Sequence, residues 1–525
     1  MARPVRAVNQ GHVRAVEPVN GTVLAHGDAR ATALGSGDET APLLANGASI
    51  EAPTFDKKFQ RRVAIICTLL TIAIDFSVFM VDPPTQRLIE DSMCYAHFPD
   101  YVPGHGLDTR CKTPEVQKPM TRLKSIVLTL QMLFPLLVQI PFGIVADKYG
   151  RRLVLTVALF GLSLAMTWTN IVLYFRDILP IWSLIPGPAL TLIGGGPPMV
   201  NSLVFTVISD VYPATERASL LYLLTAIVMM VAVVLGPLSA ALMSINPWIP
   251  MLTGLAVMYF STGMAIFIPE TRGFLGEVNY STSQDGRSND DGADPKGSVL
   301  SQAWETVSRD ARMVWRVILS SKTIMILIVG NGLGMLIFSS MFLYGLQYLT
   351  IRFHWDWSKA TYIFTIQRLS SAAALVAVLP VLSYIMTNRL GINPMNRDLY
   401  LNRASASLLA LGCVLLGLAD APWLVITALV IYGCGVGFVA ECRALVASMV
   451  DQSVLATVNT AMSTFETIVG MMGMPALGWV LSQGIERGGP WVGLPFFVMG
   501  AVGVLIMLGT FAYRLPQRPV WESHS

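Results

Sequence analysis

The stretch Gly143-Ile-Val-Ala-Asp-Lys-Tyr-Gly-Arg-Arg152 separates two apolar runs that are each about 20 residues long, which is the length that crosses a bilayer as a helix. Charged side chains are costly inside the hydrocarbon of a membrane, so this stretch is predicted to be a short loop outside it. Two membrane-spanning helices therefore turn around at this loop.

The composition extends this expectation along the 525-residue chain, because 53% of the residues are hydrophobic and only 13% are charged. A soluble domain has about a quarter of its residues charged. Apolar windows of about 20 residues recur, and they are continuous rather than alternating, which favours helices over a β-barrel. We predict an all-α membrane protein with twelve transmembrane helices. The predicted spans are 62–82, 124–146, 153–175, 186–208, 219–243, 248–268, 323–347, 361–386, 404–419, 421–446, 454–481 and 490–513.

Basic residues indicate which ends of the helices face the cytoplasm. Lys57, Lys58, Arg61 and Arg62 precede the first span, and further basic residues gather in alternate loops. Cytoplasmic loops carry such an excess, so both termini are predicted to be cytoplasmic. One loop disagrees, because five basic residues lie on the predicted opposite side: Arg87, Arg110, Lys112, Lys118 and Arg122. The net charge of +3 is too small to suggest a nucleic-acid partner.

A polar stretch near the middle divides the helices six and six. Its centre is rich in Ser, Asp, Asn and Gly, as in flexible linkers, and its last part, 300–318, has the apolar spacing of an amphipathic surface helix. The first residues lack the pattern of a signal peptide and predict a disordered cytoplasmic tail. This tail contains Glu39-Thr-Ala-Pro-Leu-Leu44, which matches an acidic dileucine sorting signal. The predicted order is tail, six-helix half, linker, six-helix half and tail: 1–60, 61–269, 270–322, 323–514 and 515–525.

The two predicted halves share a faint internal repeat. The dipeptides Ala-Thr at Ala214 and Leu-Gly at Leu235 recur at Ala456 and Leu477, and both are displaced by 242 positions. They fall around the fifth and eleventh spans, which correspond to each other if the halves are duplicated, as in many transporter folds.

Two cysteines lie in the predicted loop 83–123, while the other four lie in apolar spans. An oxidising, non-cytoplasmic side would permit a disulfide between Cys94 and Cys111. The alternative is a pair of unpaired loop thiols.

With twelve helices, a central linker and the charged loop after the second helix, the chain resembles the major facilitator superfamily of secondary transporters. The loop matches the family signature at six positions: Gly143, Asp147, Lys148, Gly150, Arg151 and Arg152. The stretch from Asp210 to Arg217 resembles the acidic-proline-arginine loop that follows the fourth helix in that family. The resemblance implies the major facilitator fold, in which two pseudo-symmetric six-helix halves rock about a central site.

A finer resemblance links the chain to one group within that family. Pro84 and Glu90 leading into Cys94, followed by Cys111-Lys-Thr-Pro-Glu-Val-Gln117, are similar to fungal facilitators that export small metabolites. More distantly, these residues resemble animal carriers for folate-like anions. The resemblance therefore implies a small organic substrate.

The signature loop has a physical interpretation as a latch between access states. Asp147 can meet Arg151 or Arg152 and, by family resemblance, the positive amino end of the eleventh helix. Gly143 is expected to permit close helix contact and Gly150 a tight turn. The alternative is a basic turn that only fixes topology. The predicted gating residues are Gly143, Asp147, Lys148, Gly150, Arg151, Arg152, Asp210 and Arg217.

Ionisable residues inside the predicted spans are functional candidates, because a charge at mid-membrane costs about 2.5–3.5 kcal/mol on insertion scales. Asp75 and Glu466 lie near the middle of their spans and are predicted to bind and release protons. The alternative for each is a structural ion pair with Arg368. Glu441 and Arg443, nearer the cytoplasmic end, are expected to extend to the surface or to form a gate.

Polar residues in probable cavity helices are candidates for substrate binding. Arg368 has a planar donor fork that suits an anionic group, and Gln367 precedes it. Asn201 and Asn331 are further candidates, although such amides usually bond to a neighbouring helix.

These features predict a secondary active transporter that moves an organic small molecule by alternating access, driven by protons and in the direction of efflux. An uptake carrier for an organic anion and a transporter-like sensor or scaffold are the alternatives. No enzyme is expected, because all six histidines lie outside the predicted spans and the HExxH, GxSxG and GxxxxGK[ST] motifs do not occur. No cofactor or metal is expected. The predicted partners are the lipid bilayer, the substrate and protons, in a monomer of the plasma membrane or, alternatively, the vacuolar membrane.

Overall fold

The computed structural model describes residues 57–102, 108–212, 214–270, 322–450 and 452–513. In these ranges twelve helical segments are long and apolar enough to span a membrane, and no strand occurs, so the predicted number of spans and the all-α class are confirmed. The dileucine match and the predicted amphipathic helix at 300–318 lie outside the described residues. The side chains of Asp147 and Arg217 also lie outside what the structure describes.

The first half of the described chain contains six long helices with short 3-10 turns between them. They are α1 (Lys57–His97), η1 (Thr109–Lys112), α2 (Pro114–Tyr149), α3 (Arg151–Tyr174), η2 (Ile181–Leu184), η3 (Gly187–Leu192), α4 (Gly196–Val211), α5 (Ala214–Ile245) and α6 (Trp248–Ala265).

The second half builds two of its six spans from shorter helices. The composite spans are α10 (Trp357–Ala373) with η5 (Ala374–Val378), α11 (Leu379–Tyr384) and η6 (Ile385–Arg389), and α13 (Pro422–Gly435) with α14 (Phe438–Met449). The other elements of this half are α9 (Lys322–Arg352), α12 (Pro394–Leu418), α15 (Gln452–Arg487), η7 (Gly489–Gly493) and α16 (Leu494–Ala512).

The region predicted as a long loop, 83–123, is mostly helical, so that prediction is wrong. Helix α1 continues through Pro83 and Pro84 to His97, and α2 begins at Pro114. Prolines are tolerated inside membrane helices because neighbouring groups satisfy the backbone that they leave unpaired. The 41 residues of α1 span about 60 Å at 1.5 Å per residue, which is twice the thickness of the hydrocarbon.

The fourth span, Ile181–Val211, includes the predicted range 186–208 but is not one continuous helix, because α4 begins only at Gly196 after η2 and η3. Residues 194–196 are three consecutive glycines with φ of +93°, +86° and +63°. Side chains with a Cβ rarely adopt this left-handed region, so the glycines form a sharp turn that separates η3 from α4.

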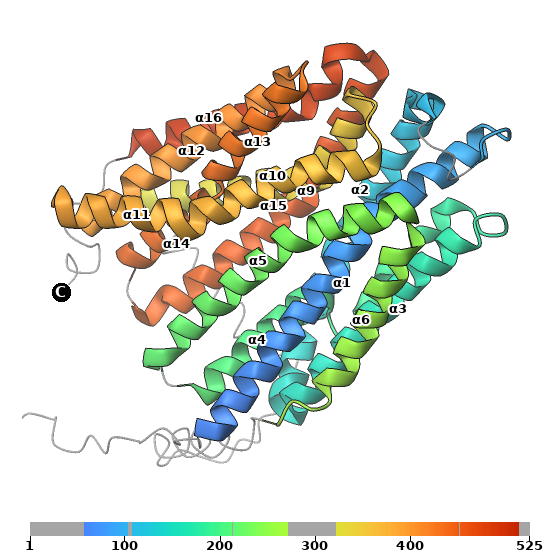
Figure 1. Cartoon of the computed structure of the whole chain (residues 1–525). Helices are drawn as coiled ribbons and strands as arrows, with labels where there is room; N and C mark the ends of the chain where they lie inside the picture. Colours follow the sequence, from blue (N-terminus) through green and yellow to red (C-terminus); the bar gives the residue numbers. More distant parts are fainter. Residues whose placement is uncertain (1–56, 103–107, 213, 271–321, 451, 514–525) are drawn as a thin grey trace, which may run out of the picture. The chain divides into compact units, whose positions relative to one another are not determined.

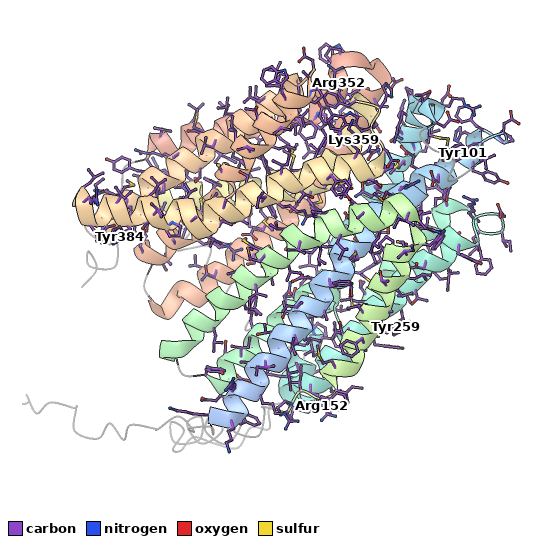
Figure 2. The ribbon with its side chains drawn as sticks, in the orientation of Figure 1. Tyr101, Arg152, Tyr259, Arg352, Lys359 and Tyr384 are labelled. Atoms are coloured by element: carbon purple, nitrogen blue, oxygen red, sulfur yellow. A yellow bond between two sulfur atoms is a disulfide. The ribbon has the colours of Figure 1, made fainter. Side chains whose placement is uncertain are left out.

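The two halves lie side by side and meet along two helix pairs, α2 with α15 and α5 with α10 (Figure 1). We call the ends of the helices near Cys94 and Cys111 the disulfide end, and the ends near Gly150 the latch end. Figure 2 shows Tyr101, Arg352 and Lys359 at the disulfide end and Arg152 at the latch end. One cluster of buried apolar side chains continues from the first half into the second at the disulfide end, whereas another lies within the first half at the latch end.

The repeat in the sequence marks equivalent points of these two helix pairs. A Cβ at Gly236 of α5 would lie 2.9 Å from Thr365 Oγ1 of α10. A Cβ at Gly478 of α15 would overlap Ser125 Oγ of α2 and lie 2.7 Å from Tyr344 Oη. Each glycine of the repeated Leu-Gly dipeptide therefore allows its helix to approach the opposite half closely.

Substituting Gly478 with alanine should weaken the contact between the halves at the disulfide end. Overpacking of this kind costs about 1–3 kcal/mol, and we expect the thermal stability of the purified protein to fall accordingly. The matched control is Gly263→Ala in α6, where a Cβ would have no neighbour within 4 Å. Equal melting temperatures for both variants would contradict the close contact at Gly478.

Candidate functional site

Glu90 is the centre of a buried hydrogen-bond network at the disulfide end. Lys112 Nζ lies 2.7 Å from both carboxylate oxygens of Glu90, and Gln117 donates to the same group. Trp357 Nε1 of the second half donates to Glu90 Oε2 at 2.6 Å. All four side chains are buried. The carboxylate is therefore held by a cation and an amide from its own half and by an indole from the other half.

Lys124 makes a second connection between the halves, one step deeper in the bundle. Its Nζ donates to Gln86 Oε1 at 2.8 Å, to the carbonyl of Leu343 at 3.1 Å and to Gln347 Oε1 at 3.2 Å. The amide of Gln347 donates in turn to Gln117 Oε1 at 3.0 Å. Because Leu343 and Gln347 belong to α9, these bonds join the second half to α1 and α2. We call Glu90, Lys112, Gln117, Lys124, Gln347 and Trp357 the seal network.

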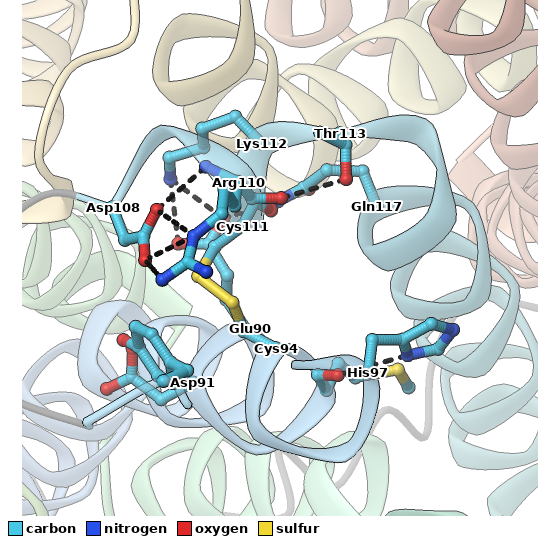
Figure 3. Close-up of a disulfide and its surroundings, with 12 residues drawn as sticks. Glu90, Asp91, Cys94, His97, Asp108, Arg110, Cys111, Lys112, Thr113 and Gln117 are labelled. Carbon is cyan, nitrogen blue, oxygen red and sulfur yellow. Dashed lines mark hydrogen bonds and ion pairs between the residues drawn. A yellow bond between two sulfur atoms is a disulfide. The ribbon is translucent and has the colours of Figure 1, made fainter. Parts of the chain in front are cut away.

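A disulfide between Cys94 and Cys111 holds one part of this network, and their Cα atoms lie 5.2 Å apart (Figure 3). Cys111 directly precedes Lys112, and its carbonyl accepts a hydrogen bond of 2.8 Å from Gln117 Nε2. The bridge therefore fixes the segment that carries the cation for Glu90.

Two local interactions flank the disulfide in the loop outside the membrane spans. Hydrogen bonds from Arg110 lower the pKa of Asp108, and the two groups form an ion pair of 2.8 Å. Tyr101 donates to Asp91 Oδ1 at 2.7 Å, and burial together with the nearby Asp91 carboxylate raises the pKa of Tyr101. The second contact ties the chain that follows α1 back onto that helix.

A small enclosed space lies below the seal network, at the seam between α1 and α10. Asp82, Arg368, Phe79 and Phe342 line this space, which has a volume of about 20 Å³. The Arg368 guanidinium carbon lies 4.5 Å from the ring centre of Phe79 and 4.7 Å from that of Phe342. Asp82 attracts Arg368 and Lys124 electrostatically and accepts a hydrogen bond of 3.3 Å from Gln86.

Arg368 contrasts with the other buried cations in its polar contacts. Within the described residues we find aromatic contacts for its guanidinium but neither a hydrogen bond nor an ion pair. Lys112 and Lys124 have their donors occupied by the seal network. The planar donor fork of Arg368 can therefore accept an anionic group without first breaking a protein hydrogen bond.

The structure does not bring the other predicted substrate residues to Arg368. Gln367 is buried and donates to Ser371 Oγ at 3.0 Å within its own helix. Asn201 is exposed on α4, and Asn331 donates to Glu466. Adjacent positions on a helix point in different directions, which explains why Gln367 faces away from its neighbour.

The two predicted proton carriers have different environments, and neither forms an ion pair with Arg368 in the described structure. Glu466 of α15 pairs with Arg443 of α14 at 2.7 Å and also accepts the bond from Asn331. One oxygen of Asp75, Oδ2, is buried and has no hydrogen-bond partner.

The latch loop makes its described contacts within the first half. Arg151 forms an ion pair with Asp210, and its backbone N–H donates to Glu270 Oε1 at 3.0 Å. Gly150 has a φ of +113°, and a Cβ there would lie 2.6 Å from Glu270 Oε2, so the expected tight turn is present. Close packing does not explain Gly143 in this state, because a Cβ there would have no neighbour within 4 Å.

The remaining two basic residues of the latch loop lie at its surface. Lys148 is exposed with its Nζ 5.6 Å from the ring centre of Tyr149, and Arg152 is exposed at the start of α3. In the described part of the chain, no group of three or more His, Cys, Asp or Glu side chains is placed to hold a metal ion.

Sequence reasoning missed Asp82 and the seal network, although a polar stripe could have indicated them. Asp82, Gln86 and Glu90 are spaced four residues apart and therefore share one face of α1. Gln117, Thr121 and Lys124 form a similar stripe on α2. Gln86, Glu90, Gln117 and Thr121 fall in the predicted loop 83–123, where no helix face was expected.

Comparisons with known proteins agree with this architecture. The model of the Major Facilitator Superfamily matches residues 121–474, which is more than half of the chain. The chain is 26% identical to the MFS efflux pump atnC of Emericella nidulans over 504 residues, covering 91% of this chain and 94% of that pump. It is also 26% identical to the efflux pump ustT of Aspergillus flavus over 442 residues, covering 81% and 83% of the two chains.

Solved structures share the fold at low sequence identity. A D-xylose–proton symporter matches with a TM-score of 0.58 and 12% identity, covering 86% of this chain and 98% of its own. The nucleoside transporter NupG matches with a TM-score of 0.55 and 14% identity, covering 86% and 100%. The family match, the twelve spans and the two paired six-helix halves agree, and the chain belongs to the Major Facilitator Superfamily of membrane transporters.

Proposed function

We propose that this transporter exports an organic small molecule by alternating access and that protons drive the export. Two of its fungal relatives are named as efflux pumps, which supports export as the direction of transport. The observation that carries the proposal is the position of Arg368 at the seam, directly below a network that closes the disulfide end.

The seal network suits a gate that must open. It consists of hydrogen bonds and ion pairs between the halves, and water can replace such bonds when the halves separate. A purely apolar contact of the same size would expose its surface to water at every cycle, at about 25 cal/mol per Å². The network therefore supports a transport cycle in which the disulfide end closes and opens repeatedly.

We propose an organic anion with a flat or ring-containing body as the substrate class. Arg368 offers unused donors to a carboxylate or similar group, and Phe79 and Phe342 flank that guanidinium with aromatic surfaces. Asp82 balances the charge of Arg368 in the absence of substrate. Gln367, Asn201 and Asn331 remain predictions that gain no support from contact with Arg368.

For proton coupling, the contacts favour Asp75 over Glu466. An ionised carboxylate that is buried without a partner is costly, so Asp75 is suited to carry a proton in this state. Glu466 is compensated by Arg443, and a proton on Glu466 would have to compete with that ion pair. Both residues remain candidates, in this order.

The test is substrate-dependent proton flux in proteoliposomes, with a panel of organic anions and lipophilic metabolites. Arg368→Gln should abolish transport of anions, whereas Gln367→Ala, at the neighbouring buried position, should retain most of it. Asp75→Asn should remove flux driven by the proton gradient but retain substrate exchange at equilibrium. Anion transport that persists in Arg368→Gln would refute the substrate assignment. A transport rate that does not depend on the proton gradient would refute proton coupling.

The remaining possibilities are an uptake carrier for an organic anion and a sensor without transport. Arg368 fits an anion in either direction, so the orientation of the active gradient in the same assay decides between export and uptake. Substrate binding without any flux would favour the sensor. We further propose that the protein acts as a monomer in the plasma membrane, with its disulfide end on the non-cytoplasmic, oxidising side.

A further inference from the structure

A buried carboxyl group in the second half has no role in the transport site described above. Glu441 lies on α14 and is 8% exposed. Its Oε1 accepts a hydrogen bond of 3.1 Å from Ser405 Oγ of α12, while its Oε2 is buried and has no partner among the residues that the structure describes. The expectation that Glu441 extends to the membrane surface is therefore wrong.

A second unpaired acceptor lies beside Glu441 in the contact between α12 and α14. Asn402 is fully buried, and its amide nitrogen donates to the carbonyl of Phe438 and to Cys442 Sγ, both at 3.3 Å. Its oxygen Oδ1 is buried without a partner. The contact between α12 and α14 thus contains two buried acceptor oxygens that lack a donor among the described residues.

The backbone of Gly437, which lies between α13 and α14, packs against this carboxyl group. A Cβ at Gly437 would lie 3.4 Å from Glu441 Oε1 and 3.6 Å from Ser405 Oγ. Glu441 lies eight residues before the end of α14, and Ser405 lies eleven residues after the start of α12. These positions are about 12 and 16 Å from the helix ends at 1.5 Å per residue, which places the group within the membrane span.

The nearby cations on α12 and α14 cannot compensate an ionised Glu441 by direct contact. Arg443 pairs with Glu466, and Arg397 pairs with Asp398 at 2.6 Å. Arg403 donates to the carbonyls of Thr510 and Tyr513. Asp398, the partner of Arg397, carries the same charge as an ionised Glu441 and offers it no compensation.

The other helices that pack on α14 add no compensating charge at this depth. The only charged residues of α9 are Lys322 and Arg352 at its two ends, and α15 contributes Glu466, which is already paired. Cys442 lies beside Glu441, where it accepts the bond from Asn402.

From these contacts we propose that Glu441, with Ser405 and Asn402, forms a proton-binding site in the second half that is occupied by one proton when the disulfide end is closed. A proton on Oε2 turns this oxygen into a donor and removes a charge that no cation of the described helices compensates by direct contact. The site differs from the Arg443–Glu466 pair, where a cation lies 2.7 Å from the carboxylate. Its role in transport, but not its existence, rests on the proposed proton-coupled function.

The first test is infrared difference spectroscopy of the full-length protein in proteoliposomes as a function of pH. A neutral carboxyl group gives a C=O band that an ionised one lacks. Glu441→Gln should remove one component of this band, whereas the matched control Glu466→Gln should leave it unchanged. Ser405→Ala should move the same component to higher frequency, because the C=O loses its hydrogen bond. This variant tests the assignment on its own if Glu441→Gln does not fold.

An unchanged band in both Glu441→Gln and Ser405→Ala, or a component lost in Glu466→Gln instead, would overturn the assignment. The second readout is transport: Glu441→Gln should lose at least tenfold of the gradient-driven rate while equilibrium exchange of substrate continues. If Glu441→Gln removes the band component but the wild-type protein shows no proton-coupled transport, the proposed function fails and the proton site stands.

Discussion

Replacing Glu90 with alanine should lower the free energy of unfolding by about 3–5 kcal/mol, because removal of one member of a buried ion pair leaves the other without compensation. Lys112 would lose both of its 2.7 Å contacts and remain buried. Trp357 would lose its acceptor in the other half at the same time. Chemical unfolding of the purified protein, followed by intrinsic fluorescence, measures the change.

The control for this prediction is Glu115→Ala, which removes an exposed carboxylate close to the network and should change the unfolding free energy by less than about 0.5 kcal/mol. Trp357→Phe removes the N–H donor of the bond between the halves and keeps a smaller aromatic ring at the same position. Spin labels at exposed positions of opposite halves, Val102 and Lys359, should then move apart. An unchanged label distance in both Trp357→Phe and Glu90→Ala would mean that the network does not close the disulfide end.

Removing the disulfide should cost about 2–4 kcal/mol of stability, the usual effect of a native bridge. Cys94→Ser, Cys111→Ser and the double variant should be destabilised equally, because each lacks the same bond. They should also lose part of the contribution of Lys112, whose segment the bridge fixes. Thermal unfolding with and without a reducing agent measures both effects.

The matched control for the disulfide is Cys434→Ser, which changes a free and partly buried thiol. Its melting temperature should stay close to that of the wild type, and a reducing agent should lower the melting temperature of both by the same amount. Cys94→Ser that melts with the wild type would contradict a stabilising bridge. Combining Cys94→Ser with Glu90→Ala should cost less than the sum of the single changes, because the two sites share Lys112.

The number of spans, the all-α class and the transporter family could be predicted from the sequence, because long apolar runs and the Gly143–Arg152 loop are local signals. The relatives and fold neighbours are transporters, which confirms that the chain is not an enzyme. The seal network could not be predicted in the same way. Glu90 and Trp357 are 267 positions apart, and only the packing of the two halves brings them together.

The partners of the charged residues inside the spans could not be predicted from the sequence either. Their positions in apolar spans correctly indicated that Arg368 and Glu466 are partly buried, but Glu441 was expected to reach the surface and is buried. The partners of all three depend on which face of each helix they occupy. Glu466 pairs with Arg443 rather than with Arg368, because α14 and α15 are neighbours. The sequence alone does not give the helix faces, so the partner of each residue could not be predicted from it.

The Cys94–Cys111 bridge has a consequence for the biogenesis of the protein. It joins α1 to η1, the short turn just before α2, and the two cysteines are only 17 positions apart in the chain. With the disulfide end on the oxidising side, as proposed above, the bond can form once α1 and the start of α2 have been synthesised, before the later helices follow. Lys112 would then already contact Glu90 in the nascent chain when α10 is added. Trp357 of α10 would meet a Glu90 carboxylate that is already held in place.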